Sequence, residues 1–388
     1  MNKQEQYERN LHKIDRVCEE AKKKGVTVSK KKGRLAGKTY RRYKIGIKQY
    51  ARYLYTNYGI TDISRAKPRH AEEYIREKVE GYKNTAESVW TIKTFFHSIE
   101  FFRVATRVTS VYKGEVRLGD KRKFLTMLKE EKIFRKSKES TVLKATRSEC
   151  ELVIQGILKT RSPIKTIVAD LLFAILYTGS RLSACLRLKV EDIDLINGTI
   201  TFHNDKGGLT HSHRLNSEAI QLFTEIIKGK KQGAPVFKIT YRNGQQKSID
   251  AAAKQIQSLI APAARRAGVN HTDERGREIT LSAHSFRKAY ASGQYEIYLK
   301  KSERDLKKEI ASRIRERPCI RGKYKKMVRK INKNTKKGKK RWPNKGELAK
   351  FLTSLDIAHS RVDVVRYYIS PSKAKYPKRI IKRRIPHK

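Results

Sequence analysis

The sequence of 388 residues is poor in cysteine, and its four cysteines are scattered along the chain. None of them forms a CxxC pair or a Cys/His spacing typical of zinc, and the ten histidines form no HExxH pattern. The spacing of the cysteines also indicates no disulfide framework. We therefore expect a chain that needs no metal and no disulfides and that works in a reducing compartment.

Long apolar runs and acidic residues are scarce as well. No apolar run approaches the length that spans a bilayer, and no secretory signal is recognisable, so we expect a cytoplasmic protein without membrane contact. The sequence contains only 38 acidic residues but 91 lysines and arginines, which gives a net charge of +53. Such a chain repels itself unless a polyanion neutralises it. Nucleic acid is favoured, because each neutralised phosphate releases counterions. Charge alone does not separate DNA from RNA, or a binding protein from an enzyme.

The apolar residues that are present recur at helical spacing between residues 39 and 102. This pattern predicts a helical domain over residues 37–138, followed by a polar linker over 139–146. Residues 1–36 have the character of a basic helical arm, for which a solvated tail and a phosphate-binding arm both remain open. The three apolar faces consist of Tyr43, Ile47, Tyr50 and Leu54, then Ala71, Tyr74, Ile75 and Val79, then Val89, Ile92, Phe96, Ile99 and Phe102.

A second domain is predicted over residues 147–370. Its segment GTITFHNDKGGLTHSHRL alternates β-branched and polar residues around a Lys-Gly-Gly turn, which is typical of a hairpin. The expected fold class is mainly α with a small antiparallel β-sheet. Residues 299–343 are strongly basic and low in apolar content, so we expect an inserted loop or a loosely docked helix there, and residues 371–388 form a basic tail. Helices are expected at 148–159, 163–178, 181–189, 215–228, 248–266, 284–316, 344–354 and 361–369.

Three motifs of this second domain carry residues that suit a phosphate ligand. Arg181 follows a glycine turn at the start of a helix, where its guanidinium can join the helix N-terminal amides on an anion. Lys206 lies at the hairpin turn and can swing onto a ligand. His284 and Arg287 are three residues apart on an expected helix and therefore share one face. Taken singly, each motif is more often a surface arginine, a solvated turn lysine or an ordinary amphipathic helix.

A fourth motif combines His359 with Tyr368, nine residues later. Tyrosine is a weak nucleophile at neutral pH because its pKa is near 10, but cations around a phosphate can lower that pKa and stabilise a pentacoordinate transition state. A lone tyrosine near a helix end is more often a packing residue. The order of the four motifs is more informative than any one of them.

The order Arg, hairpin Lys, His-x-x-Arg, His, Tyr resembles the catalytic signature of the tyrosine recombinase/integrase family. TGSRLS with LRLKVEDID resembles that family's first arginine box, HSFR its second, and AHSRVDVVRYY its histidine-to-tyrosine box. Residues 39–130 resemble the core-binding domain with which these enzymes clamp DNA. The resemblance covers roughly residues 39–298 and 344–370.

The resemblance implies an integrase of a virus, plasmid or other mobile element that binds double-stranded DNA as a dimer or tetramer. It also implies strand cleavage and rejoining without ATP or metal, because the covalent intermediate conserves the bond energy. Six residues would then act on one phosphate. Arg181 and Arg287 would grip its non-bridging oxygens, Lys206 would protonate the leaving 5′-oxygen, His284 would accept the tyrosine proton, His359 would hydrogen-bond the phosphate, and Tyr368 would form the 3′-phosphotyrosyl bond.

The chain departs from the family pattern in three ways. Ala184 stands where the family usually has an acid, Ala358 replaces a common glycine, and the interval of 72 positions from the second arginine to the second histidine far exceeds the usual one. Tyr367 is the alternative nucleophile, because adjacent helical residues point about 100° apart and only one can face the site. A DNA-binding protein that kept the fold and lost catalysis, and a basic RNA-binding or chromatin protein, remain alternative functions.

Overall fold

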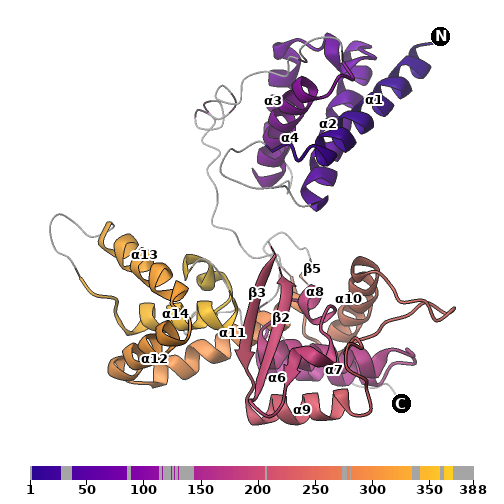
Figure 1. Ribbon diagram of the computed structural model, residues 1–388. Coiled ribbons are helices and arrows are strands. Elements are labelled where there is room, and N and C mark those ends of the chain that lie inside the picture. The colour runs from indigo at the N-terminus through magenta and orange to yellow at the C-terminus, as the bar shows by residue number, and fades with distance from the viewer. Residues whose placement is uncertain are drawn as a thin grey trace, which may run out of the picture. The chain divides into compact units, whose positions relative to one another are not determined.

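A computed structural model of the chain describes residues 2–27, 37–84, 89–112, 144–205, 208–272, 278–279, 281–333, 341–358 and 362–369, with Val116, Phe124, Thr126 and Glu130 as single positions. The chain divides into two compact units, residues 1–138 and 139–388. Each unit has a hydrophobic core of its own, and Figure 1 shows their elements. The fold is mainly helical with a small three-stranded antiparallel sheet, as the sequence predicted.

The first unit is built from helices that bury the apolar faces read from the sequence. Its helices are α1 (Lys3–Lys23), α2 (Gly37–Tyr58), α3 (Pro68–Asn84) and α4 (Val89–Val108). Helices α2 and α4 pack together, and rings from both contact each other, as Tyr50 does with Phe95. Wherever the structure describes the side chain, each residue of the three predicted faces is buried.

Helix α1 is part of this core, so the prediction of a separate arm over residues 1–36 is wrong for its helical part. Ile14, Val17, Cys18 and Ala21 are buried against the rest of the unit. They recur at i, i+3, i+4 and i+7, which is one face of a helix. The lysine runs around this face lower the average hydropathy of the segment and hid the pattern. Asn2 and Glu5 form a capping box at its start.

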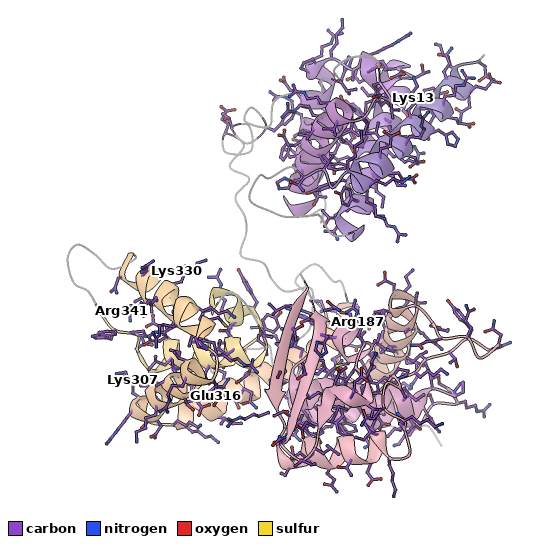
Figure 2. All side chains as sticks on the ribbon, viewed as in Figure 1. Lys13, Arg187, Lys307, Glu316, Lys330 and Arg341 are labelled. Carbon is purple, nitrogen blue, oxygen red and sulfur yellow. The ribbon has the colours of Figure 1, made fainter. Side chains whose placement is uncertain are left out.

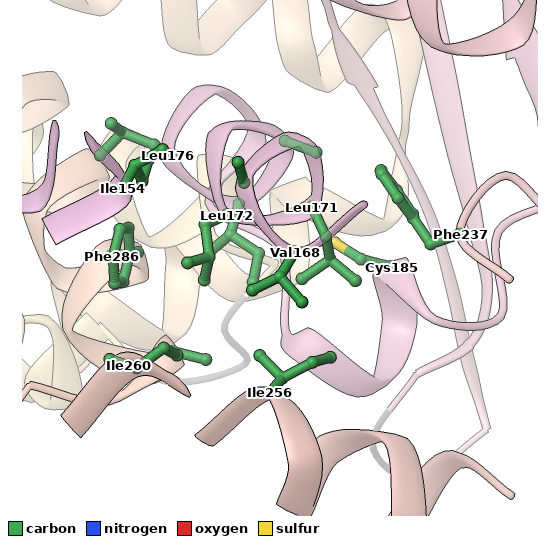
Figure 3. Packing of buried hydrophobic residues seen from close by; sticks show 14 of the residues in the cluster. Ile154, Val168, Leu171, Leu172, Leu176, Cys185, Phe237, Ile256, Ile260 and Phe286 are labelled. Atoms are coloured by element: carbon green, nitrogen blue, oxygen red, sulfur yellow. The ribbon is translucent and has the colours of Figure 1, made fainter. Parts of the chain in front are cut away.

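The second unit surrounds helix α7 (Lys165–Thr178), most of which is buried. Helices α6 (Arg147–Leu158) and α11 (Ala283–Lys300) pack against it, together with the short α8 (Leu182–Cys185), and α10 (Ile249–Arg266) packs against α6 and α8. Figure 3 shows how side chains from these helices meet in the core. A helix buried on every side is apolar all round rather than striped, which explains the run IVADLLFAILY. Helix α9 (Ser217–Ile227) covers another part of α7.

The sheet lies beside this helical core and contains the predicted hairpin. Strands β1 (Ile193–Asp194), β2 (Thr199–Asp205) and β3 (Leu209–Arg214) are antiparallel in the order β1-β2-β3. The register between β2 and β3 shifts after the pair Phe202–His211. Asn204 has a φ of 51° at this irregularity, a left-handed conformation that asparagine tolerates better than most residues. A second, two-stranded sheet of β4 (His271–Thr272) and β5 (Glu278–Ile279) was not predicted.

The described residues of the insertion, 299–333 and 341–343, are mostly helical and packed, which corrects the expectation of a loop or a loosely docked helix. It contains α12 (Glu303–Glu316) and α13 (Cys319–Lys333), which share a third hydrophobic core with α14 (Lys345–Asp356). The apolar residues that form this core are separated by many charged ones, so the segment has low average hydropathy although its helical periodicity is intact. Figure 1 shows α12, α13 and α14 together on one side of the β2–β3 hairpin.

Several predicted boundaries differ from the structure. The helix expected over 284–316 is interrupted near Ser302, whose side chain caps α12. The last helix is a short 3-10 turn, η3 (Val362–Tyr367), and α8 ends at Cys185. The segment 139–143 of the predicted linker and the tail 371–388 lie outside the described residues. Among the residues that the structure covers, no helix combines the length and the apolar character that crossing a membrane requires.

Candidate active site

Tyr368 lies directly after η3 and packs against two predicted site residues on the first turns of α11. Its ring centroid is 5.2 Å from that of His284, in an edge-on arrangement, and 5.5 Å from the central guanidinium carbon of Arg287. His284 and Arg287 share one face of α11, as their spacing predicted. Tyr368 is 7% exposed and Arg287 is 1% exposed, so this contact is buried.

Arg287 joins three distant parts of the second unit. Its Nη1 donates to the carbonyl of Gly179 at 2.5 Å, and its Nη2 donates to the carbonyl of Ile357 at 2.5 Å. Burial lowers the pKa of Arg287, and the Arg181 guanidinium lowers it further, while Tyr368 and Asp205 act in the opposite direction. An arginine stays protonated in spite of such a shift. The site therefore holds two guanidinium groups close enough to disfavour each other's charge, an arrangement that suits an anionic ligand.

The glycine turn before Arg181 is enforced by packing. Gly179 ends α7 with a φ of 64°, and a Cβ at this position would lie 2.2 Å from the ring of Tyr290. Only glycine meets both conditions without strain. The turn presents the Gly179 carbonyl to Arg287 and makes Arg181 the N-cap residue of α8.

Arg181 forms an ion pair with Asp205, which sequence reasoning did not identify as a site residue. The Asp205 side chain is 1% exposed and that of Arg181 is 21% exposed. Asp205 is the last residue of β2 and follows the left-handed Asn204. Ala184, at the position where the family usually has an acid, is buried and brings no carboxylate. In this chain the carboxylate partner of Arg181 comes from the hairpin.

The two neighbouring tyrosines have different surroundings. The hydroxyl of Tyr367 accepts a hydrogen bond from Arg366 at 2.8 Å, and its ring lies 4.8 Å from the same guanidinium. Tyr368 instead contacts His284 and Arg287. The backbone after η3 is held from two sides, because Lys144 donates to the carbonyl of Ile369 at 2.8 Å and Ser292 donates to that of Tyr368 at 3.4 Å.

Lys206 and His359, two of the six predicted site residues, lie outside the described residues. Their described neighbours belong to the site, since Asp205 pairs with Arg181 and the Ile357 carbonyl binds Arg287. Ala358 has a φ of 44°. This left-handed conformation favours glycine, which gives a physical reason for the glycine that the family commonly has at this position.

Two buried histidines of β3 also border the site and were read from the sequence only as hairpin residues. His211 and His213 face the core side of the sheet, with ring centroids 4.9 Å apart and each 5.6 Å from the ring of Phe202. Burial lowers the pKa of His211 to about 4 against the opposing effect of Asp205, and burial lowers the pKa of His213 as well. The period-two spacing of the two histidines could have indicated that both face one side.

The first unit carries a separate cavity between α2, α3 and α4. Its polar lining is rich in groups that suit a phosphate backbone, among them Arg42, Gln49, Arg52, Asn57 and Lys78. The four cysteines are unpaired, and the described residues contain no group of three His, Cys, Asp or Glu side chains arranged for a metal ion.

Comparison with known protein families gives a match for the part of the chain that contains both arginine boxes. Residues 146–298 match the model of the phage integrase family. We call residues 146–298 the integrase-family segment. The integrase-family segment contains Arg181, Lys206, His284 and Arg287, while Tyr368 lies beyond its end. No curated protein matches the sequence.

Solved structures that resemble the chain are site-specific recombinases and integrases. XerH site-specific recombinase bound to its difH substrate is similar with a TM-score of 0.51 at 15% identity, over 92% of this chain and 81% of that one. A lambda integrase dimer bound to a core site gives 0.48 at 12% identity, over 72% and 87%. The Tn1549 transposon integrase in complex with transposon right end DNA gives 0.47 at 14% identity, over 92% and 95%. At this identity the XerH likeness establishes the tyrosine recombinase fold of the integrase-family segment and its surroundings.

Proposed function

We propose that this protein is a site-specific DNA recombinase that cleaves and rejoins DNA strands through a 3′-phosphotyrosyl intermediate. The observation that carries the proposal is the contact of Tyr368 with His284 and Arg287, beside the ion pair of Arg181. A phenol, an imidazole and two guanidinium groups in one buried place suit nucleophilic attack on a phosphodiester. The net charge of +53 supports DNA as the substrate.

In the proposed reaction the Tyr368 oxygen attacks the scissile phosphorus and the bond from phosphorus to the 5′-oxygen breaks. The tyrosine proton passes to His284, and Lys206 supplies the proton that the leaving 5′-oxygen takes up. Arg181 and Arg287, with His359, stabilise the charge on the non-bridging oxygens. A 5′-hydroxyl of the partner strand then attacks the phosphotyrosine and restores the phosphodiester, so no bond energy is lost.

Work on two strands requires more than one copy of the chain at the recombination site. We propose a dimer or tetramer on double-stranded DNA and a role in integrating or excising a mobile element. The lambda integrase structure contains a dimer bound to a core site, which supports this proposal by analogy.

A covalent adduct is the direct test. The full chain is incubated with a library of duplexes whose central sequence is randomised. Each duplex carries a nick, so that a cleaved strand cannot religate. We expect a protein–DNA adduct that survives detergent denaturation and that Tyr368→Phe abolishes, because a phenyl ring carries no nucleophilic oxygen.

Tyr367→Phe is the matched control, since it removes a hydroxyl from the adjacent residue, whose ring lies against Arg366. Loss of the adduct in the control with retention in Tyr368→Phe would move the nucleophile to Tyr367. Absence of any adduct from the wild-type chain, with DNA binding intact, would favour the DNA-binding protein without catalysis.

A further inference from the structure

The inserted helices form a folded lobe rather than a solvated charge run. Their apolar residues pack with those of α14 in a core that is separate from the cores of both units. A helix with such a core has a defined face toward solvent, so the residues on that face are fixed by the helix backbone. The buried members of the core are Tyr298, Leu306, Ile310, Ile320, Met327, Leu348, Ala349, Phe351 and Leu352.

Helix α13 has one apolar and one basic face. Ile320, Tyr324, Met327 and Ile331 recur at i, i+4, i+7 and i+11 and pack into the core of the lobe. The helix contains no acidic residue. The exposed basic residues on the remaining surface, which we name the α13 basic face, are Arg321, Lys325, Lys326, Arg329 and Lys330.

The charges of α12 and α13 are compensated differently. On α12, Lys307 pairs with Glu303 at 2.6 Å and Arg313 pairs with Glu309 at 3.0 Å. Glu316 of the same helix pairs with Arg214 of β3 at 3.0 Å. Within the described part of the chain, Arg321, Lys325, Lys326 and Arg329 of α13 form no ion pair. The charge of these four side chains is therefore not balanced by an ion pair within the described residues, and Figure 2 shows the neighbouring Lys330 at the outer end of the helix.

A buried polar network joins the lobe to the rest of the second unit. The hydroxyl of Tyr298 on α11 donates to Asp356 at 2.8 Å, and Arg313 donates to the same carboxylate at 2.5 Å and to that hydroxyl at 2.8 Å. Arg317 donates to the carbonyl of Ser212 on β3 at 3.2 Å. Asp356 immediately precedes Ile357, whose carbonyl binds Arg287. The α13 basic face thus belongs to the same compact unit as the candidate active site.

The chemistry of the α13 basic face favours the sugar–phosphate backbone of duplex DNA. Lys325 and Arg329, like Lys326 and Lys330, are one i, i+4 step apart, about 6 Å along the helix axis. The α13 basic face consists of lysine and arginine only, so it offers no aromatic ring on which a base could stack. Proteins that bind single-stranded nucleic acid usually provide such rings. Long cationic side chains without such rings bind phosphates and do not read bases.

We propose that the α13 basic face is a second DNA-binding surface, which holds the phosphate backbone of duplex DNA in addition to the phosphate bound at the candidate active site. This inference rests on the proposed function for its choice of DNA over other polyanions. The α13 basic face contributes affinity rather than sequence recognition, and this contribution grows as the salt concentration falls.

The test compares two fourfold variants of the full chain that remove equal charge. In the first, Lys325, Lys326, Arg329 and Lys330 become Gln, and in the control Lys228, Lys231, Lys238 and Arg242, exposed residues of the connection between α9 and α10, become Gln. Fluorescence anisotropy measures binding to a duplex of about 40 base pairs of arbitrary sequence over a range of salt concentrations. All eight positions are on the surface, and unfolding curves establish that both variants are folded.

We expect the α13 variant to bind at least about tenfold more weakly near 0.1 M salt and to lower the slope of log affinity against log salt by about 3 units, because each phosphate contact contributes about 0.9. The control should change the slope by less than about 1 unit. Equal slopes in the two variants would overturn the proposal. So would a normal DNA slope combined with lost binding to vesicles that contain phosphatidylserine, which would assign the face to a membrane surface.

The binding assay and the adduct assay fail independently. If the wild-type protein forms no adduct while the α13 variant binds DNA more weakly than the control, catalysis is contradicted and the second surface is retained. An α13 variant that binds like the control and still forms the adduct would contradict the second surface and retain catalysis.

Discussion

Asp205 is almost fully buried, whereas the Arg181 side chain with which it pairs keeps about a fifth of its surface exposed, at 1% and 21%. A buried carboxylate fixes the orientation of a guanidinium and leaves the remaining N–H donors for a ligand. Arg181 itself follows the left-handed turn at Gly179 and is the N-cap residue of α8, a helix of only four residues. Asp205 therefore acts on the proposed reaction through Arg181, as a positioning residue.

Replacing Asp205 by Asn keeps its shape and removes its charge. We expect the single-turnover rate of DNA cleavage to fall about 10- to 100-fold, which is typical when a group that orients a functional side chain is lost. Duplex affinity should change less than about threefold, because most of it comes from phosphate contacts elsewhere. The measurements are adduct formation over time and anisotropy titration of the same preparations.

Asp205→Glu provides the conservative comparison, since it retains the carboxylate. It should recover part of the cleavage rate that Asp205→Asn loses. If both variants cleave DNA as fast as the wild type, or if both lose DNA affinity in proportion to rate, then Asp205 has no positioning role.

The limits of sequence reasoning at this scale are visible in the same pair. Arg181, His284, Arg287 and Tyr368 lie at spacings that the sequence displays, and the structure brings them together. The Arg181–Asp205 pair depends on the left-handed Asn204 and on the register shift of the hairpin. No periodicity encodes such an irregularity, because it arises from tertiary packing.

At the scale of the element, β3 places two imidazoles on its buried side. Neither nitrogen of His211 has a hydrogen-bond partner within the described residues, and the electrostatic influences on this histidine come from Asp205, Arg287, Arg181 and Arg317. Three guanidinium groups would repel a protonated imidazole at this place, and only one carboxylate would attract it. The folded state consequently favours the neutral form of His211.

This preference predicts a pH-dependent loss of stability. Burial lowers the pKa of His211 to about 4 in the folded protein, below its usual value of 6.5, so the unfolded chain takes up the proton first as the pH falls. The stabilisation is complete above about pH 6.5 and is lost as the pH falls from there toward 4, by about 3 kcal/mol in total at about 1.4 kcal/mol per unit. Urea unfolding at a series of pH values measures this dependence.

His211→Leu removes the titrating group from a place where it forms no hydrogen bond among the described residues. The free energy of unfolding of this variant should fall less steeply between pH 6.5 and 4 than that of the wild type, while the carboxylates common to both cancel in the difference. Parallel curves for the two proteins would show that protonation of His211 does not limit stability.

The lobe of α12 and α13 shows why some elements escaped prediction. The faces of α2, α3 and α4 were readable because few charges interrupt them. Leu306 and Ile310 on α12, and Ile320 and Met327 on α13, have the same helical spacing, but lysines and arginines surround them. Average hydropathy is low in such a segment, although its period is that of a packed helix. Periodicity, not average hydropathy, was the valid signal there.

At the scale of the whole molecule, two units with separate cores share one large excess of positive charge. The cavity of the first unit and the α13 basic face of the second both expose basic residues. Repulsion among these charges destabilises the free protein, and bound DNA removes it. Salt therefore acts on the free and the bound protein in opposite directions.

The expected result is that the melting temperature of the free chain rises between about 0.05 and 0.5 M salt, because the Debye length shortens from above 10 Å to below it and screens the repulsion. With a duplex in excess, the melting temperature should fall over the same range, because salt weakens DNA binding and with it the stabilisation by the ligand. Differential scanning fluorimetry of one preparation with and without duplex measures both slopes. Slopes of the same sign would mean that the excess charge is not balanced by DNA. A smaller negative slope in the α13 variant than in the control variant would assign part of the effect to that helix.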